Sequence, residues 1–270
     1  MKYIYAQRRY HQPGRFYFWT CKPPCSCDFG VLFVEPIEEP IPVRPVAHYS
    51  MGGIETDING KTRAEGVWVA GEAACVSLHG ANRLGSNSTA ECLVWGTITG
   101  TESAQYIKNV NAVPEPSTEA VQKEYARVYE QLLSRQGDEN LYTIRAELRG
   151  IMDRCVGVFR TGKELEEALR TVVALKERLT KAPVRDKTRI FNTDLTSALE
   201  LENLLDLAHA SVSCALKRTE SRGGHARRDF PTRNDDEWLK HSLAFWTPEG
   251  PRLEYSPVTI NTWKPVERKY

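Results

Sequence analysis

Residues 66–88 read GVWVAGEAACVSLHGANRLGSNS, an apolar run followed by small and polar residues. Residues 66–70 of this stretch are almost continuously apolar, which is typical of a short buried strand. The run ends directly at Gly71 and Glu72, so a turn and an acidic side chain follow the predicted strand. In α/β folds this position faces the ligand crevice. The sequence therefore places Glu72 at a candidate binding site.

A helix is expected after this loop. Ser88 and Glu91 have the spacing of a capping box, which predicts a helix from Ser88 to about Ile107. The free N–H groups and the positive dipole end of such a helix favour an anion or an electron-rich ring. The alternative on spacing alone is an ordinary capped helix that follows a glycine-rich loop.

Apolar side chains recur at helical spacing in four stretches of the second half of the chain. Such stripes are core faces, and the short connections between them favour an antiparallel bundle. Thr161 with Glu164 predicts the start of the third helix, and Asp194 predicts the start of the fourth. After Lys217 the chain turns irregular, with strand-like segments at 242–245 and 253–255. The stripes are Val121, Tyr125, Val128 and Leu132; Leu141, Ile144, Leu148 and Ile151; Leu165, Leu169, Val172 and Leu179; and Leu195, Leu199, Leu205 and Val212.

Residues 1–32 differ from the rest of the chain. They are crowded with Tyr, Arg, Pro and Cys and show no apolar periodicity. Cys21, Cys25 and Cys27 do not have the spacing of a structural zinc site. We expect residues 1–32 to be a disordered or non-native leader. Residues 33–113 are expected to form one domain and residues 114–270 a second, joined at the Pro-rich stretch 113–117.

Composition excludes several classes of protein. The 36 Lys and Arg residues nearly balance the 35 Asp and Glu residues, which argues against a strongly basic nucleic-acid binder. The mean hydropathy is −0.47, and no apolar run approaches the roughly 18 residues of a membrane helix. Seven scattered cysteines favour a reducing compartment over a disulfide scaffold. Among them, Cys75, Cys92, Cys155 and Cys214 have apolar neighbours and are expected to be core thiols.

Three separated motifs carry a resemblance to a known family. HYSMGGIETD at 48–57, the stretch at 66–88, and ESRGGHARRDFPTR at 220–233 with RLEYSPVTI at 252–260 resemble the flavoprotein subunit of succinate dehydrogenase and fumarate reductase. The resemblance covers about residues 34–270 and corresponds to the C-terminal half of such a subunit. It implies an α/β remnant of an FAD-binding domain, then an α-helical bundle domain with a small irregular and β C-terminal region. The Gly-rich dinucleotide fingerprint, the histidine that links to FAD and the proton-shuttling arginine of the family have no counterparts here.

The resemblance assigns roles to residues that match the motifs. It implies that His48 and Arg83 bind the two carboxylates of the substrate, because a guanidinium fork suits a carboxylate. Without the family, His48 reads as a structural histidine, Arg83 as a buried ion-pair member and Glu72 as a helix-start acid.

The resemblance also implies a set of cofactor contacts. These residues are Tyr49, Glu72, Ser88 and Thr89. The family usually has Leu where this chain has Thr89, which matters little if the contact is through the backbone N–H. His79 is expected to brace the loop, and Arg222 with His225 to support the site structurally. No residue is assigned to proton transfer, and none to a metal.

By resemblance, the expected function is succinate–fumarate interconversion with FAD. Hydride passes between a substrate carbon and the flavin, and electrons leave to an iron–sulfur subunit toward quinone. The expected location is peripheral, bound through membrane anchor subunits at the cytoplasmic face of a prokaryotic inner membrane, or at the matrix side in mitochondria. Two alternatives remain open: an L-aspartate oxidase-like flavoenzyme, and an inactive truncated remnant.

Overall fold

The computed structural model describes residues 16–20, 30–34, 48–110 and 115–266, with side chains from residue 48 onward. The chain divides into two units, residues 1–46 and 47–270. In the first unit, strand β1 (Phe16–Thr20) pairs antiparallel with strand β2 (Gly30–Val34). Neither strand follows from the sequence pattern. Most of the predicted leader lies outside the described residues.

The second unit begins with short elements around the predicted site. Strand β3 (Ile54–Glu55) pairs in parallel with strand β4 (Ala74–Cys75), which directly follows the 3-10 turn η1 (Gly71–Ala73). Gly53 has a φ of +121°, and a Cβ there would lie 2.5 Å from the carbonyl oxygen of Ala73. Only glycine allows this close approach. The long helix α1 (Asn87–Asn109) follows.

The predicted strand at residues 66–70 is wrong. In that stretch only Trp68 forms a β-bridge, an isolated antiparallel pair with Lys61, and Val67 is 45% exposed. Val69 donates its N–H to the carbonyl of Gly60, so the segment folds back on the preceding loop. A buried parallel strand needs strands on both sides, and the described residues provide none beside this segment.

The predicted capping box at the start of α1 is also wrong. The N-cap is Ser86, which has a φ of +67° and makes no side-chain cap hydrogen bond. Glu91 does not reach back to the helix start. It binds Tyr49 and His79 from two other segments. Tertiary hydrogen bonds therefore use the carboxylate that local spacing assigned to a cap.

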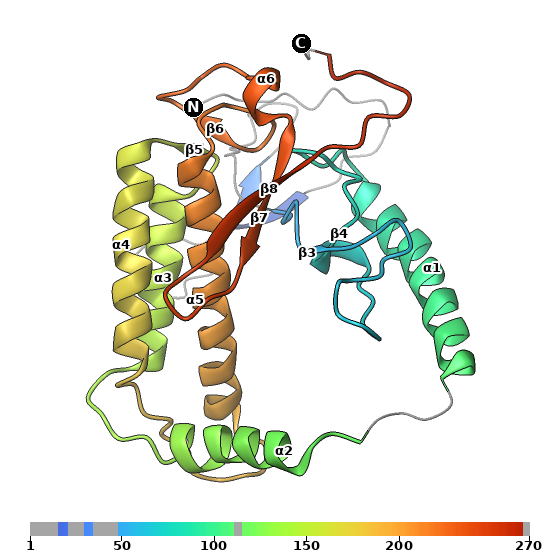
Figure 1. Ribbon diagram of the computed structural model, residues 1–270. Coiled ribbons are helices and arrows are strands. Elements are labelled where there is room, and N and C mark those ends of the chain that lie inside the picture. The colour runs from blue at the N-terminus through green and yellow to red at the C-terminus, as the bar shows by residue number, and fades with distance from the viewer. Residues whose placement is uncertain (1–15, 21–29, 35–47, 111–114, 267–270) are drawn as a thin grey trace. The chain divides into compact units, whose positions relative to one another are not determined.

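A helical bundle forms most of the rest of the chain, as the apolar stripes predict. Helices α3, α4 and α5 lie side by side, with α2 leading into them (Figure 1). The last turns of the first predicted helix adopt π geometry, which the sequence did not indicate. The elements are α2 (Thr118–Tyr125), the π-helix η2 (Ala126–Leu132), α3 (Leu141–Cys155), α4 (Gly162–Leu179) and α5 (Thr193–Lys217).

The bundle core is built from the predicted stripes. Ile144 of α3, Leu165 and Val172 of α4, and Leu205 and Val212 of α5 are completely buried. The exception is the start of the first stripe, where Val121 and Tyr125 on α2 are exposed. A helix whose outer face carries charges and whose inner face carries leucines gains most of its stability from this packing.

One of the two predicted bundle caps is confirmed and the other is wrong. Thr161 caps α4 and accepts from the N–H of Glu164 at 3.3 Å. The cap of α5 is Asn192, whose side chain accepts from the N–H of Leu195 at 2.8 Å. Asp194 lies inside the helix and accepts from the hydroxyl of Tyr142. Asn and Asp cap helices about equally well, so tertiary contacts decided between them.

Short strands complete the unit after the bundle. The parallel pair β5 (Phe159–Arg160) and β6 (Ala226–Arg227) joins the end of α3 to the later loops. A single-turn helix, α6 (Asp235–Trp238), precedes the hairpin of β7 (Lys240–Phe245) and β8 (Arg252–Pro257). The hairpin confirms both strand-like segments. The predicted domain boundaries near residues 32 and 113 stay predictions.

None of the helices in the described part of the chain combines the length and apolar character that crossing a membrane requires. Within the same residues, no group of three or more His, Cys, Asp or Glu side chains is arranged to bind a metal ion.

The bundle core yields a stability prediction on one helix. Leu205 is completely buried and Leu207, two residues later on α5, is 65% exposed. We expect Leu205→Ala to lower the free energy of unfolding by about 2–5 kcal/mol, because it removes buried methyl groups and leaves a cavity. The matched control Leu207→Ala should cost less than about 0.5 kcal/mol. Urea unfolding followed by circular dichroism measures both, and equal losses would contradict the assigned core.

Candidate active site

Two loops carry three of the six predicted site residues, and the structure brings Tyr49 and Arg83 into contact. The first, residues 48–53, carries His48 and Tyr49, and the second, residues 77–86, carries Arg83. The Cζ atom of Arg83 lies 4.6 Å from the centroid of the Tyr49 ring, which is cation–π stacking distance. His48 is exposed beside Tyr49 in the chain.

Glu91 is the buried anchor of these loops. Its side chain is 2% exposed and accepts a hydrogen bond from the Tyr49 hydroxyl at 2.6 Å. The Nε2 atom of His79 lies 2.6 Å from the same carboxylate oxygen, and the Tyr49 and His79 rings meet edge to face. The sequence correctly gave His79 a bracing role. The anchoring role of Glu91 was missed, since the spacing of Ser88 and Glu91 indicated only a helix cap.

The protonation of Tyr49 follows from this environment. Burial, followed by the hydrogen bond to Glu91 and its negative charge, raises the pKa of the Tyr49 hydroxyl well above 10. Tyr49 therefore stays neutral and remains a donor to Glu91. Glu91 also lies in the second turn of α1, near the helix end that favours negative charge.

Arg83 has unused hydrogen-bonding capacity. One terminal nitrogen donates to the carbonyl of Leu84 at 3.1 Å. Its Nε is buried and has no partner among the described residues. A buried, unpaired donor is costly unless a ligand satisfies it. The stacked guanidinium therefore suits an anionic ligand.

The predicted cofactor contacts lie at two places. Glu72, in η1, accepts from the N–H of Ser50 at 2.9 Å, which joins it to the loop of Tyr49. Ser88 and Thr89 lie in the first turn of α1, whose N-cap offers no side-chain acceptor. Their N–H groups therefore fit an anion or an electron-rich ring at the positive end of the helix.

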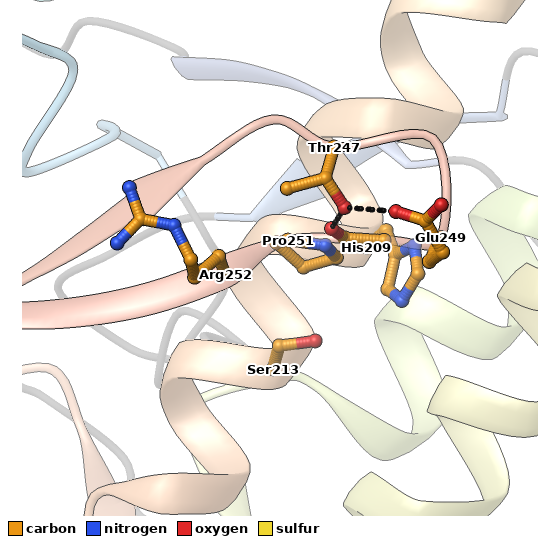
Figure 2. Close-up of a pocket in the computed structure, with 7 residues that line it drawn as sticks. His209, Ser213, Thr247, Glu249, Pro251 and Arg252 are labelled. Atoms are coloured by element: carbon orange, nitrogen blue, oxygen red, sulfur yellow. Dashed lines mark hydrogen bonds between the residues drawn. The ribbon is translucent and has the colours of Figure 1, made fainter.

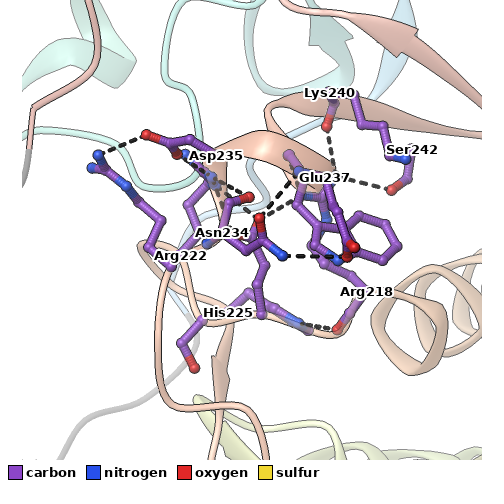
Figure 3. Close-up of polar contacts among 12 residues, drawn as sticks. Arg218, Arg222, His225, Asn234, Asp235, Glu237, Lys240 and Ser242 are labelled. Carbon is purple, nitrogen blue, oxygen red and sulfur yellow. Dashed lines mark hydrogen bonds and ion pairs between the residues drawn. The ribbon is translucent and has the colours of Figure 1, made fainter.

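A charged network surrounds Glu220, which is completely buried. Figure 3 shows several of its members, among them Arg218, Arg222 and Asn234. Glu220 accepts from Arg218 at 2.7 Å, from Arg222 at 2.8 Å and from the N–H of Asn234 at 3.0 Å. Burial raises the pKa of Glu220, but these hydrogen bonds outweigh it and hold the pKa below the usual range. Glu220 is thus a paired, ionised group, and Arg222 is one of its partners. That Arg222 supports the active site stays a prediction.

His225 is a neutral member of the same network. Burial lowers its pKa to about 4, and the nearby positive charges of Arg160, Arg218 and Arg227 add to the effect. Its Nε2 lies 3.1 Å from the carbonyl of Arg218, and its Nδ1 lies 3.3 Å from a terminal nitrogen of Arg160. These partners fit a tautomer that donates through Nε2 and accepts at Nδ1.

Arg227 was not identified from the sequence, although it is 3% exposed. Its guanidinium donates to Asp229 and to the carbonyls of Ala215, Leu216 and Arg218 at the end of α5. Arg227 therefore caps this helix from outside it. The pairing with Arg227 holds the pKa of Asp229 well below its usual range.

The cysteine prediction is partly wrong. Cys155 is buried in the bundle, whereas Cys92 is exposed and Cys75 and Cys214 are half-buried. Cys92 follows Glu91 on α1, and its neighbour Leu93 is 68% exposed. The apolar sequence around Cys92 is a solvent-facing part of the helix in this chain.

A hollow lies elsewhere, between α5 and the loop of the β7–β8 hairpin (Figure 2). It measures about 490 Å³ and is lined by His209, Ser213 and residues 247 and 249–252. Thr247 donates to Glu249 and to the carbonyl of Gly250 within the loop. None of the predicted site residues lines this hollow.

Two family models match the chain. The first is described as an FAD binding domain and matches residues 20–89. The second is described as the fumarate reductase flavoprotein C-terminus and matches residues 145–270. The chain is a relative of the fumarate reductase and succinate dehydrogenase flavoprotein subunits. The resemblance drawn from the motifs is thereby confirmed.

Two relatives show how much of a full subunit the chain matches. The chain is 41% identical over 250 residues to the fumarate reductase flavoprotein subunit of Haemophilus influenzae, covering 92% of this chain and 42% of that protein. It is 39% identical over 240 residues to the succinate dehydrogenase flavoprotein subunit of Rickettsia bellii, covering 85% of this chain and 40% of that protein. The chain thus spans about two fifths of the length of these relatives.

Solved structures of such subunits have the same fold as this chain over the matching part. A FrdA chain of Escherichia coli quinol fumarate reductase superposes with a TM-score of 0.81 at 40% identity, over 87% of this chain and 40% of that chain. Mycobacterium smegmatis Sdh1 superposes with a TM-score of 0.69 at 33% identity, over 82% of this chain and 36% of that chain. The fold described above is therefore the fold of the matching part of these subunits.

The neutral His225 predicts a pH dependence of stability. An unfolded histidine binds a proton near pH 6.5, whereas His225 in the folded chain binds one only near pH 4. The unfolded chain therefore binds more protons between these values, and the free energy of unfolding falls as the pH drops through them. Since His225 is partly exposed, we expect a loss of at most about 3 kcal/mol.

Urea unfolding of the native chain and of His225→Gln at pH 7.0, 6.0 and 5.0 measures this effect. The glutamine amide can still donate to the carbonyl of Arg218 but does not titrate. His209 and His241, whose pKa values burial also lowers, are present in both proteins and cancel in the comparison. Parallel pH profiles for the two proteins would show that His225 is not the responsible group.

Proposed function

We propose that residues 48–91 form one wall of a succinate–fumarate site in a flavoprotein that contains this chain. The observation that carries the proposal is Arg83, stacked on Tyr49 with a buried Nε that has no partner among the described residues. A guanidinium held in this way presents a planar fork to a carboxylate. Its relatives, named as fumarate reductase and succinate dehydrogenase subunits, support the same substrate class.

Arg83 and His48 would bind the two ends of the dicarboxylate. The Arg83 guanidinium stacks on the ring of Tyr49, and Glu91 accepts a hydrogen bond from the Tyr49 hydroxyl. In this proposal the Arg83 guanidinium orients the substrate, and the Tyr49 ring on which it stacks is held in place before the substrate binds. Positioning and preorganised charge of this kind account for much of catalysis.

Glu72, Tyr49, Ser88 and Thr89 would hold FAD. The residues fit, because the first turn of α1 has no side-chain cap and its N–H groups can donate to the flavin. When bound, the flavin supplies the acceptor and donor of hydride. Glu72 already fixes the backbone of Ser50, so one carboxylate would connect the cofactor to the substrate loop. Proton transfer is not assigned to any residue of this chain.

An iron–sulfur subunit would accept the electrons and pass them toward quinone. Membrane anchor subunits would then attach the complex at the cytoplasmic face of a prokaryotic inner membrane, or at the matrix side in mitochondria. The word subunit in the names of the relatives supports such an assembly, as does the solved structure of a quinol-fumarate reductase with menaquinol.

A chimera tests the role of Arg83. Residues 48–270 of this chain would replace the matching part of the Escherichia coli relative, which is 40% identical over 252 residues. We expect flavin binding and succinate oxidation in this chimera. Arg83→Ala and Arg83→Lys should each weaken transition-state binding by on the order of 2–5 kcal/mol. Alanine removes the positive charge, and lysine keeps it but lacks the planar two-nitrogen fork of the guanidinium.

The control is Arg154→Lys, an exposed arginine on α3 that pairs with Glu167. It should leave kcat and KM for succinate unchanged. Near-normal kcat and KM in Arg83→Lys would refute the binding role. A chimera that binds flavin but oxidises no succinate would instead favour the inactive-remnant alternative.

A second prediction concerns the 270-residue chain by itself. Its sequence contains no G-x-G-x-x-G fingerprint, and no residue matches the family's FAD-linking histidine or proton-shuttling arginine. We expect the purified chain to hold no covalent flavin and to show no dye-linked succinate oxidation. Denaturing gels viewed for flavin fluorescence and a dye-reduction assay check this. Measurable oxidation would overturn it.

A further inference from the structure

The loop that carries Arg83 needs support from outside itself. Residues 77–86 contain no helix or strand apart from the turns that lead into α1. His79 holds its early part through Glu91, and Ser77 lies 3.1 Å from the Nε2 of His241. The segment nearest Arg83 is held differently. The carbonyl of Ala81 accepts from the N–H of Gly224 at 2.9 Å.

Gly224 belongs to a tight turn, residues 222–225, which we name the glycine turn. Arg222 and His225 exchange two backbone hydrogen bonds, at 2.8 and 3.0 Å, which close the turn. Gly223 has a φ of +56°, and a Cβ there would lie 2.4 Å from the carbonyl oxygen of Ala81. Both the backbone conformation and the close approach require glycine.

The same turn also contacts the other site loop. A Cβ on Gly224 would lie 3.2 Å from the Cε of Met51, three residues after His48. The glycine turn therefore packs against both segments that carry the proposed substrate-binding residues. Its Gly224 N–H contacts the Ala81 carbonyl, two residues before Arg83.

The glycine turn is itself fixed from behind by charge. Arg222 donates to Glu220 through two nitrogens, at 2.8 and 3.0 Å, and to Asp235 at 2.6 Å (Figure 3). On the other side of the turn, His225 lies between the carbonyl of Arg218 and the guanidinium of Arg160. Charge-assisted pairs to a buried carboxylate are strong and directional, so the turn has little freedom to move.

We propose that the glycine turn is the positioning element of the substrate loop: the N–H of Gly224 and the missing side chain of Gly223 set the Ala81 backbone and thereby the place of Arg83. The proposal rests on the proposed function, in which Arg83 binds the dicarboxylate. The glycine turn touches neither substrate nor flavin in this scheme, and it acts through the loop.

Hydrogen exchange of the full 270-residue chain tests the positioning without any activity. In Gly223→Ala we expect the amides of residues 78–86 to exchange about tenfold faster or more, because the loop must move away from the new Cβ. Amides in α4 should be unchanged. The matched control is Gly224→Ala, which keeps the N–H. Its Cβ would lie 3.2 Å from the flexible end of Met51 and 3.6 Å, an ordinary contact distance, from the Ala81 carbonyl oxygen, so it should leave the loop protected.

Arg222→Lys decides the matter if Gly223→Ala does not fold. Lysine keeps the charge but loses the fork that grips Glu220 and Asp235, so residues 78–86 should again exchange faster. Unchanged exchange of this loop in folded Gly223→Ala, or in Arg222→Lys where that variant decides, would overturn the proposal.

The chimera separates positioning from general support. There Gly223→Ala should raise KM for succinate by about tenfold, with flavin content and the flavin absorption spectrum unchanged. Loss of flavin with KM unchanged would show a merely structural role and overturn the proposal. If the native chimera binds no dicarboxylate, the proposed function fails, while the exchange result still decides whether the turn positions the loop.

Discussion

The buried carboxylate of Glu91 is the constraint on which the site depends. It draws Tyr49 from one loop and His79 from another onto the start of α1. A buried carboxylate is stable only with such partners, so the three segments are fixed together. The ring of Tyr49 is in turn the surface on which Arg83 stacks. The position of the arginine therefore depends on the hydrogen bonding of one buried carboxylate.

Support from the C-terminal part of the chain has a similar logic. The network around Glu220 places charges so that each is paired and the glycine turn is held between them. The two loops of the site and this turn are far apart in sequence but share contacts at Ala81 and Met51. The three separated motifs of the sequence therefore meet in space at Ala81, Met51 and the glycine turn.

The bundle could be predicted from the sequence because its signal is local. Stripes such as Ile144 with Leu148, or Leu205 with Val212, report helical burial directly. The strand expected at Trp68 could not be judged in this way, because its stability depends on neighbours elsewhere. Glu91 was misread and Arg227 missed because partners such as Tyr49 for Glu91 and Ala215 for Arg227 lie on other segments. The predicted roles of His48, Arg83, Tyr49, Glu72, Ser88 and Thr89 came from the resemblance, and only ligand binding can test them.

The contact between Asp229 and the start of α4 has a consequence for the order of folding. The bundle helices α3, α4 and α5 pack with neighbours along the chain, so their contacts close short loops and form quickly. Asp229 accepts from the N–H of Gly162 across 67 residues, and Arg227 can bind the last carbonyls of α5 only once that helix has ended. We therefore expect the segment that carries the glycine turn to dock late, onto a bundle that has already formed. Until that segment has been synthesised, the carbonyl of Ala81 lacks the N–H of Gly224, so the loop of Arg83 would be without one of its supports.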